Sequence, residues 1–272
     1  MAIITLTSDW GTRDYYTAAV KGKILSLLPD ATIVDITHEI TPYSISQAGF
    51  TLKNCFRCFP KGTIHIIAVN TIESPDNPHI VVKAEGQYFI STDNGIFSHI
   101  LDGKFEEAVY IDVEQDTNAF TFITRDRFAK VAAMIAKGVP LSDIGAPRLK
   151  LNIGGAFCAV PHADSIEGVV TYIDAYENVI TNISKEMFER ERKGRDFVIK
   201  VKSDLYTVEE ISDSYLDVDD VCDLVAIFGT HGYLEIALRN ARLSSLCGID
   251  IDAPIKVEFY DSEPEPSQCT LF

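Results

Sequence analysis

The stretch Thr7-Ser8-Asp9-Trp10-Gly11-Thr12-Arg13-Asp14 determines how the N-terminal half of the chain folds. It follows an apolar run from Ile3 to Leu6, typical of a buried strand, and precedes a helix-like segment from Tyr15 to Leu28. A strand that ends in an acidic residue and a Gly turn before a helix places polar groups at the carboxyl edge of an α/β sheet. We therefore expect Asp9 and Asp14 to face a ligand crevice there, or one of them to cap the following helix.

The negative charge of Asp9 and Asp14 indicates which ligands this edge of the sheet can bind. Carboxylates repel phosphate, and no Gly-rich phosphate-binding loop follows the strand. Ribose hydroxyls, amines and cationic ligands are the groups that a pair of carboxylates can hold. A nucleoside or a positively charged small molecule is the ligand class that fits this edge.

Strand-like and helix-like segments alternate through the first half of the chain. The expected strands are 3–7, 32–36, 63–69, 80–83, 87–90 and 108–113, and the expected helices are 15–28, 44–59, 96–101 and 125–137. From about residue 165 short strands and turns dominate, at 168–173, 178–183, 196–201, 221–228, 233–238 and 255–260. The pattern predicts an α/β N-terminal domain with a mostly parallel sheet, residues 1–164, and a β-rich, sandwich- or barrel-like C-terminal domain, residues 165–272.

Charge and hydropathy exclude several classes of partner. The formal net charge is −16, from 24 basic and 40 acidic residues, whereas binding to nucleic acid needs a basic surface. No apolar run reaches the roughly 20 residues of a membrane span. The first residues carry no basic segment ahead of an apolar one, so we expect no signal peptide and a cytoplasmic protein.

Cysteines give no indication of a metal site. Cys55 and Cys58 form a C-x-x-C pair, but neither a second pair nor an H-x-x-x-H partner accompanies it. Three-residue spacing within a helix would place both thiols on one face, where buried free cysteine is common. We expect these thiols to pack in the core, and the sequence predicts no metal and no cofactor.

Five motifs, in order along the chain, resemble those of the S-adenosylmethionine (SAM)-dependent halogenase and hydrolase family, which contains the fluorinase, the chlorinase and the SAM hydroxide adenosyltransferases. They are Thr7-Ser8-Asp9-Trp10-Gly11 with Asp14 and Val20-Lys21-Gly22; Asp35-Ile36-Thr37-His38-Glu39-Ile40 with Gln47-Ala48; Asp93-Asn94-Gly95; the segment from Ile173 to Ile183, with Glu177 where Gly is usual; and Gly232-Tyr233-Leu234-Glu235-Ile236-Ala237.

The resemblance implies a homotrimer whose ligand lies between the N-terminal domain of one subunit and the C-terminal domain of the next. SAM is the substrate, and a nucleophile displaces methionine at C5′ of the ribose. Because the sulfonium is already a good leaving group, such a site mainly orients and desolvates the nucleophile. An acidic pocket agrees with a ligand that carries a sulfonium and an ammonium.

Binding roles follow from the resemblance, motif by motif. Asp9 would bind the ribose 2′- and 3′-hydroxyls, and Asp14 and Asp174 would lie around the methionine ammonium. Asn178 would bind near the ribose or the adenine. The adenine pocket would be formed with the help of three residues of one segment, Tyr233, Leu234 and Ala237.

The chain departs from the hydrolase branch at the groups that position water. That branch uses an Asp, an Arg and a His, and the corresponding positions here hold Asn70, Asn77 and Ile123. None of these side chains supplies charge, whereas activating water usually needs a base or an organised polar shell.

Three hypotheses remain open. The altered loop from Asn70 to Pro78 could supply another base, with Glu73, Asp76 and His79 as candidates. Another nucleophile, such as a halide, could replace water. Alternatively, the protein binds SAM or adenosine without turning it over. Hydrolysis of SAM to adenosine and methionine is the working prediction, and a catalytically degraded binding protein is its alternative.

Overall fold

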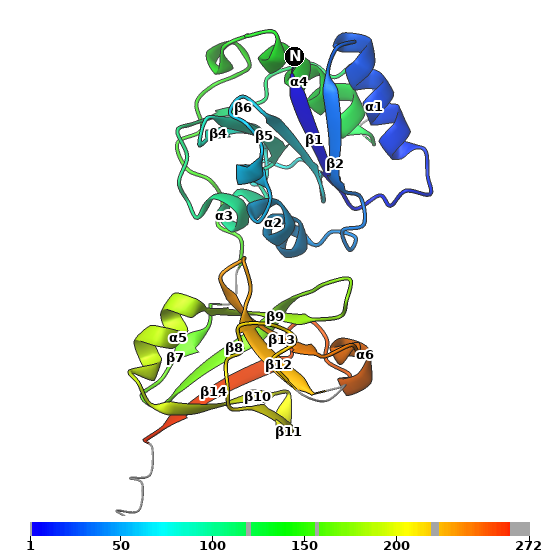
Figure 1. The fold of residues 1–272 in the computed structure, drawn as a ribbon. Coiled ribbons are helices and arrows are strands. Elements are labelled where there is room, and N and C mark those ends of the chain that lie inside the picture. The colour runs from blue at the N-terminus through cyan, green and yellow to red at the C-terminus, as the bar shows by residue number, and fades with distance from the viewer. Residues whose placement is uncertain (1, 118–120, 156–157, 219–222, 262–272) are drawn as a thin grey trace, which may run out of the picture. The chain divides into compact units, whose positions relative to one another are not determined.

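The structure is a computed structural model that describes residues 2–117, 121–155, 158–218 and 223–261 (Figure 1). The chain separates into two compact units, residues 1–156 and 157–272. The first unit is α/β and the second is β-rich, so the predicted fold class is confirmed.

A six-stranded sheet forms the centre of the first unit, in the order β2-β1-β3-β5-β4-β6. Its strands are β1 (Ile3–Ser8), β2 (Thr32–Thr37), β3 (Ile64–Ala68), β4 (His79–Ala84), β5 (Gln87–Thr92) and β6 (Glu107–Tyr110). Strands β2, β1, β3 and β5 are parallel, and β4 runs antiparallel to both of its neighbours. The β4–β5 hairpin turns at Glu85 and Gly86, both with positive φ, as the sequence predicts.

Helices cover both faces of this sheet (Figure 1). They are α1 (Tyr16–Leu27), α2 (Ile45–Lys53), α3 (Ile96–Leu101) and α4 (Ala129–Ala136), and a π-helical turn, Thr124–Phe128, leads into α4. Helices α1 and α4 bury apolar side chains in one core cluster, and α2 and α3 bury theirs in another. The strands between them are therefore apolar on both sides, as a parallel sheet with two covered faces requires.

The predicted helix over residues 44–59 is wrong at its C-terminal end. Helix α2 stops at Lys53, and a separate 3₁₀ turn covers Phe56–Cys58. The Phe50 carbonyl accepts from the Asn54 amide at 3.2 Å and from the Asn54 side chain at 2.8 Å, and the next amide, of Cys55, bonds to the Leu52 carbonyl at 3.1 Å in a 3₁₀ rather than an α-helical pattern. As a result Cys58 is exposed and Cys55 is half-buried, so the two thiols do not both pack in the core.

A chain of buried polar groups crosses the sheet beneath α2. Nδ1 of His65 lies 2.7 Å from Oγ1 of Thr5, and Nε2 lies 2.7 Å from Oε1 of Gln87. Gln87 in turn donates to the Phe56 carbonyl at 3.2 Å. Burial lowers the pKa of His65 to about 4, against the smaller opposing effect of the Gln87 hydrogen bond.

This shift predicts loss of stability in mild acid. The folded state binds the His65 proton more weakly than the unfolded chain does, so this contribution is complete above pH 6.5 and declines as the pH falls towards 4. The free energy of unfolding should fall by roughly 3 kcal/mol over that interval from this group. Fluorescence of Trp10, the only tryptophan, reports urea unfolding of the first unit. His65→Asn should flatten the pH dependence relative to wild type, and an unchanged slope would contradict the assignment.

The second unit is an antiparallel sheet in the order β11-β10-β14-β8-β9-β13-β12, and β7 pairs with β8. Its strands are β7 (Val160–Pro161), β8 (Ser165–Ile173), β9 (Val179–Ser184), β10 (Asp196–Val201), β11 (Ser203–Val208), β12 (Leu224–Phe228), β13 (Tyr233–Leu238) and β14 (Pro254–Tyr260). The end strands β11 and β12 lie close together, so the sheet is nearly closed and barrel-like. Its interior is filled by apolar side chains such as Phe188 and Ile236.

Two short helices accompany this sheet, α5 (Lys185–Arg192) and α6 (Leu243–Cys247). Ser184 caps α5 by accepting a hydrogen bond from the Met187 amide at 3.2 Å. Within the residues that the structure describes, no helix has the length and apolar character to cross a membrane.

Candidate functional site

The carboxyl edge of the parallel strands gathers the polar residues of the first unit. Asp9 follows β1, Asn70 lies two residues after β3, and Asp93 follows β5, and these three strands are neighbours in the sheet. Asp9 is half-buried, and its Oδ2 accepts a hydrogen bond from the Tyr43 amide at 2.9 Å. Asp14 is exposed in the turn before α1. The structure thus places Asp9 and Asn70 at one edge of the sheet, while Asp14, the other carboxylate of the strand-end prediction, lies in the turn before α1.

Aromatic side chains pack beside Asp9. The Trp10 and Phe122 rings meet edge to face with centroids 5.7 Å apart, and Tyr16 meets Phe122 in the same way at 5.3 Å. Tyr15 stacks on Tyr16 at 4.5 Å and is 65% exposed. This cluster gives the edge an apolar wall next to its carboxylates.

The positions that depart from the hydrolase pattern lie in three different environments. Ile123 is 7% exposed and packs in the core cluster of α1 and α4. Asn70 adopts a left-handed conformation with φ 49°, and its carbonyl accepts from the Asn94 side chain at 3.0 Å. Asn77 closes a tight turn with Ser74, and its Oδ1 accepts from Asn152 at 3.3 Å. The Asn70 backbone and the Asn77 side chain therefore shape the loop, and Ile123 fills the core.

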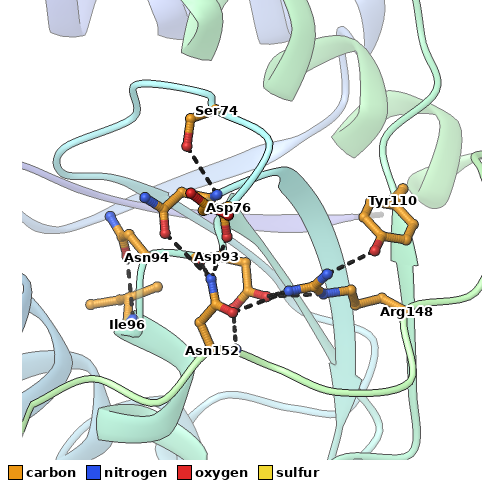
Figure 2. Close-up of polar contacts among 9 residues, drawn as sticks. Ser74, Asp76, Asp93, Asn94, Ile96, Tyr110, Arg148 and Asn152 are labelled. Carbon is orange, nitrogen blue, oxygen red and sulfur yellow. Dashed lines mark hydrogen bonds and ion pairs between the residues drawn. The ribbon is translucent and has the colours of Figure 1, made fainter.

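A network around Asp93 holds the loop 70–78 from one side (Figure 2). Nδ2 of Asn152 donates to the backbone carbonyls of Asp76, at 2.6 Å, and Asp93, at 2.5 Å. The Asp93 carboxylate is fully buried and is bound by Arg148 through Nε at 3.1 Å and Nη2 at 2.8 Å. Arg148 also donates to the Tyr110 hydroxyl at 2.7 Å. Sequence reasoning missed Arg148 and Asn152; the only signal was that a buried aspartate needs a cationic partner.

A second cluster holds the same loop from the other side. Nη1 of Arg127, in the π-helical turn, donates to Glu73 Oε2 at 2.8 Å and lies 3.1 Å from Nδ1 of His79. His79 is 1% exposed, and its Nε2 lies 2.9 Å from the Thr71 carbonyl. Burial lowers the pKa of His79, and the charge of Arg127 acts in the same direction. Both ring nitrogens of His79 are thus engaged, with Nε2 as the donor.

The three base candidates of the loop therefore differ in availability. His79 is buried and held at both nitrogens, and the Glu73 carboxylate is paired with Arg127. Asp76 is exposed, and its carboxylate makes no hydrogen bond or ion pair with any residue that the structure describes. The Glu73 side chain is 41% exposed but bound to Arg127, so Asp76 is the candidate that is both exposed and free of an ion pair with the described residues.

In the second unit, Asp174 organises the β8–β9 hairpin loop. Its Oδ1 accepts from the amides of Tyr176, at 2.9 Å, and Asn178, at 2.8 Å, while Oδ2 accepts from the Asn178 side chain at 3.1 Å. Asn178 is 8% exposed. The structure thus brings Asp174 and Asn178 into direct contact, and both sit in one tightly hydrogen-bonded loop.

Glu177 anchors this loop to α6. Its φ is 65°, in the left-handed region that glycine adopts most easily. Its carboxylate accepts from the Ser245 amide at 2.9 Å and from Nη1 of Arg242 at 3.1 Å, as well as from the Ser245 hydroxyl. The hydrogen bonds from Ser245 are the main cause that lowers the pKa of Glu177. These contacts offset the strain that a non-glycine residue carries in this conformation.

Strand β13 carries the residues expected at an adenine pocket. Leu234 is fully buried in the core of the unit, Ala237 is 1% exposed, and Tyr233 is half-buried. Between them Glu235 is 5% exposed and accepts from the Tyr215 hydroxyl at 2.5 Å, and its Oε2 lies 3.0 Å from Nε2 of His231. The sequence analysis did not single out this buried carboxylate, although Glu at an inward strand position requires such partners.

Metal-ligand clusters are absent from the part of the chain that the structure describes: no group of three or more His, Cys, Asp or Glu side chains converges there.

Comparison with known proteins places these features in a family. The profile of the SAM hydroxide adenosyltransferase N-terminal domain matches residues 4–145, and that of the C-terminal domain matches residues 168–256. The chain belongs to the SAM hydroxide adenosyltransferase family. Both halves of the resemblance seen in the sequence are thereby confirmed.

Relatives within this family span nearly the whole chain. An (R)-S-adenosyl-L-methionine hydrolase of Methanocaldococcus jannaschii is 28% identical over 91% of this chain and 92% of its own length. A fluorinase of Actinopolyspora mzabensis is 26% identical over 89% and 92%, respectively. The solved structure of an uncharacterized conserved protein from Thermotoga maritima superposes with a TM-score of 0.83, at 27% identity over 94% of this chain and 99% of that one. The SAM hydroxide adenosyltransferase match is thus not limited to isolated motifs.

Proposed function

We propose that this protein hydrolyses SAM, displacing methionine from C5′ of the ribose with water or hydroxide to give adenosine and L-methionine. The observation that carries the proposal is the match to both domains of the SAM hydroxide adenosyltransferase family, with relatives named SAM hydrolases along almost the full chain. No cofactor or metal takes part in the proposed reaction.

The geometry of Asp9 supports a ribose-binding role. One carboxylate oxygen is held by the Tyr43 amide, which leaves the other to accept hydroxyl hydrogens at the open edge of the sheet. Asp14 is exposed nearby in sequence, and the whole chain carries a net charge of −16, which attracts a ligand bearing a sulfonium and an ammonium.

Asp76 is the residue that we propose for orienting or deprotonating the water. The carboxylate is accessible, whereas Glu73 is paired with Arg127 and His79 is buried. The backbone of Asp76 is fixed by Asn152, which is what a group that must hold a nucleophile in line requires.

The alternative is a protein that binds SAM or adenosine without turnover. The specific observation that favours it is the apolar environment of Ile123 together with the structural hydrogen bonds of Asn77, because neither position can polarise water. Retained ribose and adenine residues are common to both functions, so only turnover separates them.

We also propose that the functional assembly is a homotrimer, with each site formed by the first unit of one copy and the second unit of the next. Large apolar side chains of the first unit support a covered surface, since Ile72, Leu149 and Ile153 are 74%, 86% and 89% exposed. Exposed apolar side chains of this size are typical of protein interfaces.

The test is incubation of the purified protein with SAM and chromatography of the products, alongside calorimetric titrations with adenosine and with SAM. Adenosine formation that is lost in Asp76→Asn but kept in Asp30→Asn, an exposed aspartate ahead of β2, would support hydrolysis and the role of Asp76. Adenosine binding without any product would favour the binding protein. No binding of either compound would contradict both functions.

A further inference from the structure

Two segments that carry different motifs interlock at the carboxyl edge of β1. The Gly11 amide donates to the His38 carbonyl at 2.7 Å, and the Ile40 amide donates to the Ser8 carbonyl at 3.3 Å. Asp9 lies between these two backbone hydrogen bonds. The position of its carboxylate therefore depends on how residues 38–43 are held.

The His38 side chain is fixed on several sides. It is 4% exposed, and its Nδ1 lies 2.7 Å from the Ser8 hydroxyl. Its Nε2 lies 3.1 Å from Oδ1 of Asp35, close enough for electrostatic attraction, and its ring is nearly parallel to that of Trp10, at 8° and 6.5 Å between centroids. With Asp35 facing Nε2, the proton belongs on that nitrogen, so the Ser8 hydroxyl donates to Nδ1.

Asp35 connects this arrangement to helix α1. Its Oδ2 accepts from Lys21 at 2.6 Å. Partial burial acts to raise the pKa of Asp35, but the hydrogen bond from Lys21 and the interaction with His38 outweigh it and lower the pKa, so the carboxylate remains charged. The series Lys21, Asp35, His38 and Ser8 ends at the residue that directly precedes Asp9.

Ser8, His38 and Asp35 resemble a catalytic Ser-His-Asp triad in composition. Ser8 cannot act as a nucleophile, however, because it is buried. Ser8 is 1% exposed at the end of β1, so its hydroxyl cannot reach a substrate carbon. The residue that meets the open edge is its neighbour Asp9. The hydrogen-bonded series therefore influences the position of Asp9.

We propose that His38 is a positioning residue for Asp9: through Ser8 and the two backbone hydrogen bonds it sets the carboxylate where it accepts both ribose hydroxyls. The inference rests on the proposed function, in which Asp9 binds the ribose. His38 also begins the segment that ends at Tyr43, whose amide holds Oδ2 of Asp9, so one side chain controls the position of Asp9 from both directions. A carboxylate that must meet two hydroxyls tolerates little displacement, because hydrogen bonds weaken steeply with distance and angle.

The test compares the affinities for adenosine and 2′,3′-dideoxyadenosine, measured by calorimetry for each variant. The ratio of the two affinities isolates the hydroxyl contacts from the adenine contacts. Wild type should prefer adenosine by about 100-fold or more, because adenosine gains two hydrogen bonds to a charged group and each alone confers at least about tenfold. Asp9→Ala should reduce the ratio to near one.

His38→Phe keeps the ring and its packing against Trp10 but removes both polar contacts. It should reduce the ratio at least about fivefold while leaving the affinity for dideoxyadenosine within about twofold, since the adenine contacts are untouched. His38→Asn, whose Oδ1 can still accept from Ser8, should restore part of the ratio. The matched control is His162→Phe, on an exposed histidine of the second unit, which should match wild type.

The possible results distinguish the positioning role of His38 from the ribose-binding function of Asp9. A ratio lost in Asp9→Ala but unchanged in His38→Phe overturns the positioning role and leaves the proposed function standing. A wild-type ratio near one overturns the ribose-binding function itself. If the His38 variants fail to fold, Asp35→Asn decides: its carboxylate is 39% exposed, so the fold should persist, and an unchanged ratio would overturn the proposal.

Discussion

Replacement of Asp9 by alanine is expected to lower kcat/KM for adenosine formation from SAM by about 100-fold or more. Two hydroxyl hydrogen bonds to one carboxylate contribute about 1.5 to 3 kcal/mol each, and both are lost together. Thermal stability should change little, because Asp9 is half-buried and its carboxylate accepts one hydrogen bond, from the Tyr43 amide. The measurement is initial rate against SAM concentration, with Asp30→Ala as the matched control.

Co-expression of Asp9→Ala with Asn178→Ala chains tests where the two residues meet. If each site draws Asp9 from one copy and Asn178 from the next, random assembly restores one site in every mixed trimer, which is about a quarter of all sites. If both residues of a site come from one chain, no mixture regains activity. Activity equal to that of the separate variants would therefore contradict a site shared between subunits.

Replacement of Arg148 by methionine is expected to cost about 3 to 5 kcal/mol of unfolding free energy. The Asp93 carboxylate is fully buried, so removal of Arg148 leaves a charge without its cationic partner. The amide of Asn152 still donates to Oδ1 at 3.0 Å, but one neutral hydrogen bond does not replace a bidentate ion pair. Trp10 fluorescence during urea unfolding measures the effect.

The matched control is Arg57→Met. Arg57 also donates to a carboxylate, that of Glu85, through two nitrogens. Its Nη2 lies 2.5 Å from Oε1. Both partners are about half exposed, at 50% and 48%, so the pair should be worth no more than about 1 kcal/mol. Equal losses in the two variants would contradict the explanation by burial.

The sequence predicted elements well where local pattern and tertiary packing agree. Strands β10 and β13 and helix α3 lie where the apolar periodicity placed them. Helix α5 was not predicted, because most of its residues are charged and the helical periodicity of its apolar residues is weak. Its signal was Ser184 as an N-cap with basic residues in the last turn. The helix expected over residues 44–59 was too long, because the helix-like pattern continues past the end of α2 at Lys53 into the 3₁₀ turn Phe56–Cys58.

In the candidate site, too, residues set by local sequence could be predicted, and residues brought together by tertiary packing could not. Asp9 could be placed at the carboxyl edge of the sheet from sequence, because it directly follows an apolar strand that precedes a helix. Arg148 and Asn152 could not, because they lie 55 and 59 residues from Asp93 in a segment without regular structure. The engagement of His79 by Arg127 was likewise invisible, since it depends on a π-helical turn.

Fixing the loop 70–78 at both ends changes the entropy of ligand binding. Ordering a flexible backbone costs about 1 to 2 kcal/mol per residue. Here Asn94, Arg127 and Asn152 already immobilise the loop in the folded chain, so that loss of freedom occurs during folding. For the ligand site that we propose beside this loop, such a preorganised wall would leave more of the contact energy as affinity.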